Sequence, residues 1–230
     1  MTTWRVWVVA GVVLLGACAA RAAEFTSPQG FSLSYPDAWA ALSKDQTDEV
    51  RKKAMSFFKN VTEASLDQVA VMIGEESAGG FAANANVVVT PGSAPLMEKT
   101  EAELRQFVTE QYSKVGLVLY DVQVEKTKVG DLDVVSSHYG LKVPSVEGTL
   151  RQWQVMVPAK RRTYILTCTS LEADQVKYQP VFTALVSSFR VTPGSWWEDL
   201  LDSDVFKYGV IGGLAGGAVA WLKLRKRRAA

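Results

Sequence analysis

Histidine and cysteine are scarce in this chain. Its 230 residues include one histidine, His138, and two cysteines, Cys18 and Cys168. These three side chains are too few for the four nitrogen and sulfur ligands of a typical structural zinc site. Cys18 lies in a leading apolar run and Cys168 in an apolar, β-branched run, so we expect no disulfide and a buried Cys168. The sequence therefore predicts no metal site and no cofactor.

Catalytic motifs are also missing. The chain contains no Gly-x-Ser-x-Gly nucleophile elbow and no phosphate-binding loop that ends in Lys-Ser/Thr. On an alternating strand His138 would share a face with Ser136 and Lys142, which leaves a hydrolase built around His138 as an alternative. Strand neighbours two apart are about 6.5–7 Å apart at Cα. We expect His138 to be structural or on the surface, and the protein not to be an enzyme.

Positive charge is scarce in the middle of the chain. The full sequence has 25 Lys and Arg against 24 Asp and Glu, a net charge of +1. Seven basic residues lie in positions 1–21 or 223–230, which leaves 18 against 24 acidic residues between them, a net charge of about −6. A nucleic-acid-binding domain needs a basic surface. The composition therefore excludes that class.

The first 23 residues have the pattern of an export signal. An apolar run from Val6 to Ala20 follows Arg5 and has the length of a signal-peptide hydrophobic region. Residues 15–18 (LGAC) resemble a lipobox, which would make Cys18 the lipidated first residue. Residues 20–22 (ARA) instead suit an ordinary signal peptidase. Lipidation at Cys18, plain cleavage and an uncleaved anchor remain open alternatives.

A second apolar stretch, residues 205–222, predicts a transmembrane helix. Its 18 residues carry one charge, Lys207, and as a helix they would cover about 27 Å. Glycines recur in it at three- and four-residue spacing, which suits close packing against another membrane helix, although small residues are also common in membrane helices generally. These glycines are Gly209, Gly212, Gly213, Gly216 and Gly217.

Charge on either side of this stretch predicts its orientation. The basic tail 223–230 is expected in the cytoplasm, and the acidic juxtamembrane linker 194–204 on the other side. An N-terminal export signal agrees with that orientation. We therefore expect the domain between the two ends, residues 24–193, on the periplasmic side of a bacterial cytoplasmic membrane.

Hydrophobic periodicity within residues 24–193 predicts an α+β domain. Connections too short for helical crossovers join the last four expected strands, so the sheet should be antiparallel and flanked by helices. The expected strands are 31–35, 69–74, 85–90, 117–128, 132–143, 149–157 and 162–169, and the expected helices are 45–64, 100–115 and 174–188. Pro180 is expected to kink the last helix or to start its main part.

Several local strings resemble the PsbP-like superfamily. They are residues 30–36 (GFSLSYP) followed by Trp39, residues 86–89 (NVVV), residues 164–167 (YILT) and residues 186–190 (VSSFR). The resemblance implies an α/β/α sandwich over nearly the whole domain. Among the relatives, an exported bacterial DcrB-like protein is the closest comparison. The resemblance implies no ligand-binding residue, because these relatives do different jobs.

Topology, resemblance and the missing catalytic motifs together favour a non-enzymatic binding or assembly module. It would be tethered to the membrane and present its PsbP-like domain to an unidentified envelope protein. One alternative is an envelope receptor for a small molecule or lipid, with a pocket between sheet and helix. The other is the hydrolase that uses His138.

Overall fold

The structure is a computed structural model that describes residues 22–57, 68–75, 81–143 and 146–192. Most of the predicted export signal, Cys18, the stretch 205–222 with its five glycines, and the basic tail lie outside these residues. In the described ranges no helix is both long enough and apolar enough to cross a bilayer. The expected positions of both membrane-directed ends stay predictions.

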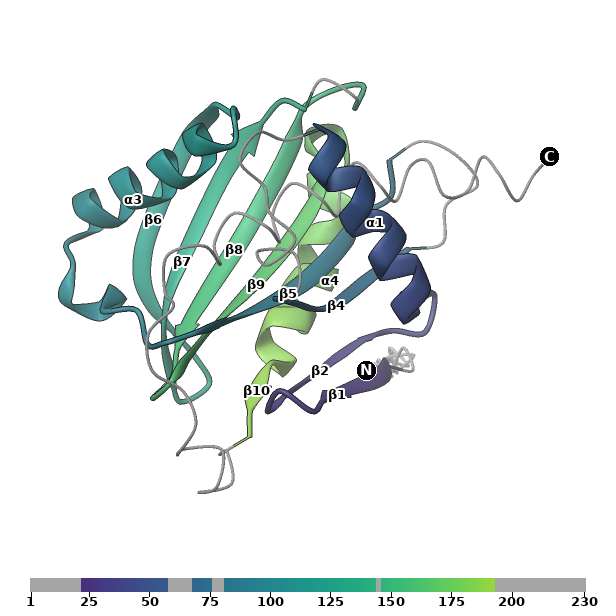
Figure 1. The fold of residues 1–230 in the computed structure, drawn as a ribbon, viewed down its shortest axis with the longest axis horizontal. Coiled ribbons are helices and arrows are strands. Elements are labelled where there is room, and N and C mark those ends of the chain that lie inside the picture. The colour runs from purple at the N-terminus through teal and green to yellow at the C-terminus, as the bar shows by residue number, and fades with distance from the viewer. Residues whose placement is uncertain (1–21, 58–67, 76–80, 144–145, 193–230) are drawn as a thin grey trace, which may run out of the picture.

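A seven-stranded antiparallel sheet forms the centre of the domain (Figure 1). Every pair of neighbouring strands runs antiparallel, so the expected sheet type is confirmed. In spatial order the strands are β3 (Trp39–Ala41), β4 (Val69–Glu75), β5 (Asn84–Pro91), β9 (Arg162–Leu171), β8 (Leu150–Pro158), β7 (Leu132–Leu141) and β6 (Leu119–Val129).

The four strands β6 to β9 follow one another in the chain and lie side by side in the sheet, as their short connections predicted. Gly130, at φ +59, lies in the turn between β6 and β7, where a left-handed backbone favours glycine. The expected strands 117–128, 132–143, 149–157 and 162–169 therefore exist, with ends shifted by one or two residues.

A three-stranded sheet lies beside the main one and was only partly predicted. It consists of β1 (Ala22–Ser27), β2 (Phe31–Pro36) and β10 (Arg190–Val191), in the order β1-β2-β10. β2 matches its prediction, whereas β1 and β10 were not predicted as strands. The short β3 of the main sheet was missed as well. β1 begins at Ala22, two residues before the expected start of the domain.

Within the described residues three helices flank the sheets: α1 (Lys44–Phe57), α3 (Glu101–Lys114) and α4 (Gln175–Ser188). The same residues include the 3-10 turns η1 (Leu96–Glu98) and η2 (Glu172–Asp174). Thr100 caps α3 in a capping box: its hydroxyl accepts from the Glu103 N–H, and the Glu103 carboxylate accepts from the Thr100 N–H. α4 runs without a break through Pro180. The expectation that the main part of the helix starts at Pro180 is therefore wrong.

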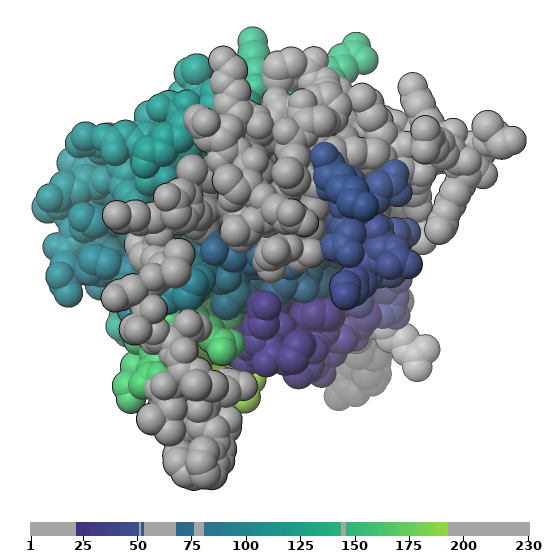
Figure 2. Space-filling view, in the orientation of Figure 1, coloured from purple at the N-terminus to yellow at the C-terminus, as the bar shows by residue number. Residues whose placement is uncertain are grey.

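Two hydrophobic cores lie on opposite faces of the main sheet. On one face α1 and α3 pack against the sheet through residues such as Val50 and Leu104. On the other face α4 and the small sheet pack through residues such as Phe182 and Phe31. Figure 1 shows α1 and α3 in front of the sheet and α4 behind it, and Figure 2 shows the front side in space-filling form. The arrangement confirms a mixed α+β fold with helices on both faces.

Candidate functional site

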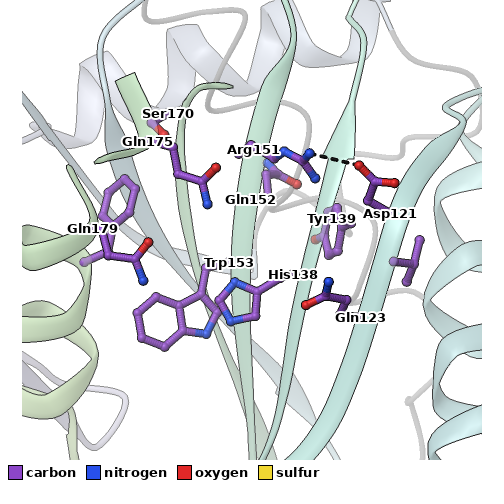
Figure 3. Close-up of a pocket in the computed structure, with 12 residues that line it drawn as sticks. Asp121, Gln123, His138, Tyr139, Arg151, Gln152, Trp153, Ser170, Gln175 and Gln179 are labelled. Carbon is purple, nitrogen blue, oxygen red and sulfur yellow. Dashed lines mark hydrogen bonds and ion pairs between the residues drawn. The ribbon is translucent and has the colours of Figure 1, made fainter. Parts of the chain in front are cut away.

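An open groove of about 520 Å³ lies on the α4 face of the sheet. α4 packs over β9 and β2, while β6, β7 and β8 extend beyond it. The groove runs between these uncovered strands and the helix (Figure 3). Its lining combines polar side chains from the strands with side chains from the first half of α4.

Two stacked rings lie in this groove. His138 of β7 and Trp153 of β8 are direct cross-strand neighbours, and their ring centroids lie 5.2 Å apart at an interplanar angle of 20°. The indole Nε1 of Trp153 donates to the Oγ of Ser136 at 3.0 Å, which fixes the orientation of the indole. Burial lowers the pKa of His138 below its usual 6.5, and the more weakly acting Glu125 opposes this. Burial therefore favours the neutral form of the His138 imidazole.

The hydrolase arrangement is not present in the described residues. Ser136 is 2% exposed, and its hydroxyl receives the Trp153 N–H instead of bonding to His138. A Ser-His catalytic pair needs a direct hydrogen bond between the two side chains and a third group that orients the imidazole. Within the described part of the chain His138 is hydrogen-bonded to neither a serine nor a carboxylate. The expected structural role of His138 fits this geometry, although the ring lies in a groove.

An arginine closes one end of the groove. The Nη2 of Arg151 in β8 lies 2.9 Å from the Oδ2 of Asp121 and 2.8 Å from the Oε1 of Glu172, so one guanidinium joins β6 to the turn before α4. Its Cζ also lies 5.2 Å from the ring centre of Tyr120. These contacts hold the Arg151 side chain, which is 23% exposed, in one position.

A bulge in β6 makes room for this cluster. The register with β7 shifts between Tyr120 and Gln123, and Asp121 has φ +51, an uncommon value for a residue other than glycine. The Tyr120 ring lies directly over Gly140, where a Cβ would fall on the ring. Gly140 is therefore required by close packing, and the bulge directs Asp121 toward Arg151.

Two buried hydroxyls beside Arg151 have no hydrogen-bond partner among the described residues. Ser170 of β9 is the cross-strand neighbour of Arg151 and is 1% exposed. Its Oγ and the phenolic oxygen of Tyr120 are both buried and unpaired. Buried hydroxyls of this kind are normally paired with protein or water. Of the two residues, Ser170 lines the groove, whereas the Tyr120 ring lies over Gly140.

Side-chain amides line both walls. Gln175 and Gln179 of α4 are exposed, and Gln123 projects from β6 opposite them. Figure 3 shows these amides directed into the space between sheet and helix. Each amide can both donate and accept a hydrogen bond, which suits a polar guest.

The structure also bears on the other reactive residues considered in the sequence. Cys168 is fully buried in β9, and this burial raises the pKa of its thiol, so the predicted role as a small hydrophobe is confirmed. Among the described residues no group of three or more His, Cys, Asp or Glu is placed to hold a metal ion. The lipidation of Cys18 and the packing role of the five glycines concern residues outside the described ranges.

Sequence reasoning singled out His138 but missed Arg151, Trp153 and Ser170. These three come from β8 and β9, and only the strand register brings them together. One sequence signal was available: Arg151 and Trp153 alternate with Leu150, Gln152 and Gln154 in β8, which places them on one face of that strand. That signal marks one face of a strand but does not reveal which residues lie opposite.

The structure is an α+β domain with helices on both faces of its main sheet and an open, polar groove on the α4 face. The PsbP family model matches residues 22–191, about three quarters of the chain, and the chain belongs to the PsbP family. This match confirms the family resemblance found in the local strings. The DcrB-like subgroup stays a prediction.

Solved structures of similar fold have low sequence identity to this chain. The PsbP protein CyanoP from Synechocystis sp. PCC 6803 is 13% identical with a TM-score of 0.51, over 76% of this chain and 95% of CyanoP. LpqN from Mycobacterium tuberculosis, described as involved in cell envelope biogenesis, is 11% identical with a TM-score of 0.43, over 75% of this chain and 92% of LpqN. Comparison with the curated proteins gave no match. The likeness to CyanoP supports the fold alone.

Proposed function

We propose that this protein is a non-enzymatic binding module of the bacterial envelope, and that the groove holds part of another envelope protein. The observation that carries the proposal is the lining. Stacked rings, side-chain amides and the unpaired buried hydroxyl of Ser170 line the groove, but no catalytic pair is present among the described residues. Such a surface can recognise a polar guest but lacks the groups that would transform it.

The ends of the chain supply the tether in this proposal. The export signal 1–23 carries the domain across the membrane, with or without lipidation at Cys18. Residues 205–222 then span the bilayer and leave the tail 223–230 in the cytoplasm. The glycine stripe of that span would pack against another membrane helix. The groove would thereby face the periplasm and be held close to other membrane proteins.

Site-specific photo-crosslinking in cells tests the binding role. A photoreactive residue at Gln179, on the groove wall, should give a discrete adduct with one envelope protein. The same residue at Glu110, exposed on α3 on the opposite face of the sheet, is the matched control. Arg151→Glu, which repels Asp121 and Glu172, should remove the Gln179 adduct. Equal adducts from both positions, or an adduct that Arg151→Glu leaves unchanged, would contradict the proposal.

The size of the groove favours a second candidate, a receptor for a small molecule. Its volume of about 520 Å³ lies within the range of small-molecule pockets, roughly 300–1,000 Å³. Native mass spectrometry of the detergent-released protein would show a bound mass that Trp153→Ala removes. The polar lining does not suit a lipid, because an acyl chain requires apolar walls.

A further inference from the structure

The two ends of the main sheet carry opposite charge. The end that contains β10, named the β10 end, has five basic and two acidic side chains and a net charge of +3; it comprises positions 27–31, 90–95, 128–133, 158–163 and 189–192. The opposite end has two basic and four acidic side chains and a net charge of −2; it comprises positions 119–121, 141–143, 146–151 and 171–175. Positive charge in this acidic domain is therefore concentrated at one end.

Two exposed cations of the β10 end pair with no carboxylate in the described part of the chain. Lys160 lies in the turn between β8 and β9. Arg190 lies in β10, where its Nη1 donates to two backbone carbonyls at 2.7 and 2.8 Å. By contrast, Lys128 in the neighbouring β6–β7 hairpin pairs with Asp133 at 2.9 Å. Lys160 and Arg190 are therefore the cations through which this end can bind an anionic surface.

Hydrogen bonds fix the β8–β9 hairpin beside the point where the chain leaves the domain. The turn before β2 joins the two: the Gln29 carbonyl accepts from Nη1 of Arg162 at 2.9 Å, and the Gly30 carbonyl accepts from the N–H of Thr192 at 2.9 Å. Thr192 is the last described residue. Figure 1 shows β10 at the same end of the domain as the lower ends of β8 and β9. The chain therefore leaves the domain from its positively charged end.

The length of the following segment limits how far this end can lie from the membrane. In the proposed function residues 205–222 span the bilayer, so the 12 residues 193–204 join Thr192 to the span. They reach at most about 43 Å when fully extended and about 18 Å as a helix. The opposite end of the sheet lies a further strand length away, about 33 Å for the 10 residues of β9. The tether therefore holds the β10 end toward the lipid headgroups.

We propose that the β10 end docks on the anionic phospholipid headgroups of the membrane, with Lys160 and Arg190 at the phosphate groups. Basic side chains are attracted to an anionic surface within about one Debye length, about 8 Å at physiological salt. The acidic end is repelled from the same surface, so the two ends together orient the domain. The Arg151 end of the groove lies at the acidic end and is thereby turned away from the bilayer. This inference rests on the proposed function, because it requires the tether.

Fluorescence quenching of the full chain in bilayer nanodiscs tests the docking. A fluorescent amino acid replaces Ser93, an exposed residue beside Gly92, whose N–H donates to the Arg161 carbonyl at 2.6 Å. The lipids carry a nitroxide quencher on a fraction of their headgroups, and the bilayer is either phosphatidylcholine alone or phosphatidylcholine with phosphatidylglycerol. Quenching at Ser93 should be stronger with phosphatidylglycerol and should fall as salt is added. The same fluorophore at Glu147, exposed at the opposite end, should be quenched less in both bilayers.

Charge reversal separates the basic cluster from a general effect of charge. Lys160→Glu should lower the ratio of docked to undocked domain by about 5-fold or more, and the addition of Arg190→Glu by about 25-fold or more in total. If the double variant does not fold, the single variant and the salt dependence carry the test. Lys142→Glu, which makes the same charge change at an exposed position of the opposite end, is the matched control and should leave quenching at Ser93 unchanged.

Equal quenching at Ser93 in both bilayers, or quenching that Lys160→Glu leaves unchanged, would overturn the docking. Equal quenching that the double variant nevertheless removes would show that the acidic linker 194–204, and not the lipid, occupies the β10 end, and would also overturn it. If the protein enters the nanodiscs but Ser93 is quenched no more than Glu147, this inference fails and the proposed tether stands. A protein that does not enter the nanodiscs rejects the tether and this inference together.

Discussion

Two polar clusters on opposite faces of the strands β6 to β9 differ in their hydrogen bonding. On the α3 face, the Tyr139 hydroxyl bonds to that of Tyr112, which donates to Gln152 at 2.9 Å, and Gln152 donates to Thr169 at 2.9 Å. All four are 2% exposed or less. On the α4 face, Ser170 of β9 and Tyr120 of β6 have buried hydroxyls with no partner among the described residues, and Ser170 lines the open groove. The α3 face is not fully paired either, since the amide oxygen of Gln154 has no partner among those residues.

This difference suggests that one cluster stabilises the fold and that the other serves recognition. A closed, buried network gains from low dielectric because every member is paired, and it fixes how α3 sits on the sheet. An open cluster with unpaired groups gains little for folding but offers hydrogen bonds to a guest. We therefore expect substitutions on the α3 face to change mainly the free energy of unfolding. Those on the α4 face should change mainly binding.

The largest expected effect comes from Tyr139→Ala. This change removes a fully buried ring that packs edge-on against Tyr112 at 5.1 Å between centroids, and it leaves a cavity. The free energy of unfolding should fall by about 3–5 kcal/mol, measured by denaturant titration of the detergent-solubilised protein. Tyr139→Phe, which keeps the ring, is the control and should cost far less. A loss below about 1 kcal/mol for the alanine variant would contradict the stability role of this face.

Gly140→Ala should lower the free energy of unfolding by an intermediate amount and should also weaken binding at the groove. The added methyl group coincides with the Tyr120 ring, so the ring must leave its place and the bulge with Asp121 must shift. Overpacking of this kind costs about 1–3 kcal/mol. The same change should reduce the Gln179 crosslink. Gly130→Ala, where a Cβ meets nothing within 4 Å, tests backbone strain without a clash. If it weakens the crosslink equally, the packing explanation is wrong.

Arg151→Met should change binding at the groove more than it changes the free energy of unfolding. The aliphatic side chain keeps much of the packing over Tyr120 but removes the bridge between Asp121 and Glu172. Both carboxylates are substantially exposed, so the unfolding free energy should change by no more than about 1 kcal/mol. Crosslinking from Gln179 should nevertheless fall clearly. A large loss of stability with unchanged crosslinking would reverse the assignment of the two faces.

The smallest effect concerns pH and His138. Burial lowers the pKa of this imidazole, so between pH 6.5 and the folded-state pKa the unfolded chain binds a proton that the folded chain does not. The contribution is fully present above pH 6.5 and is lost as pH falls through the folded-state pKa. Thermal unfolding from pH 7.5 to 5 should therefore show decreasing stability, with a shallower slope in His138→Gln. Identical slopes would show that the pKa of His138 is the same in the folded and unfolded states, which would contradict the effect of burial.

Local sequence patterns predicted the elements of the fold well where they were long and regular. The periodicity of residues 100–115 correctly gave α3, because its apolar positions recur at the helical period and Thr100 caps it. The short connections of β6 to β9 correctly gave hairpins. β1 and β3 were missed because a half-exposed strand of six residues and a strand of three carry too few alternations to stand out.

The sequence by itself determined the type of protein, an α+β domain of the PsbP family. The hydrophobic periodicity, the turn residues and the short family-like strings each lie within a few neighbouring positions, so they can be recognised without the structure. The groove was decided by the tertiary structure alone. Arg151, Ser170 and Tyr120 are separated by up to 50 positions, yet the cross-strand register and the β6 bulge bring them to one end of the groove. Whether a hydroxyl is paired or left open depends on which strand lies beside it and which helix covers it, and no pattern within one strand contains that information.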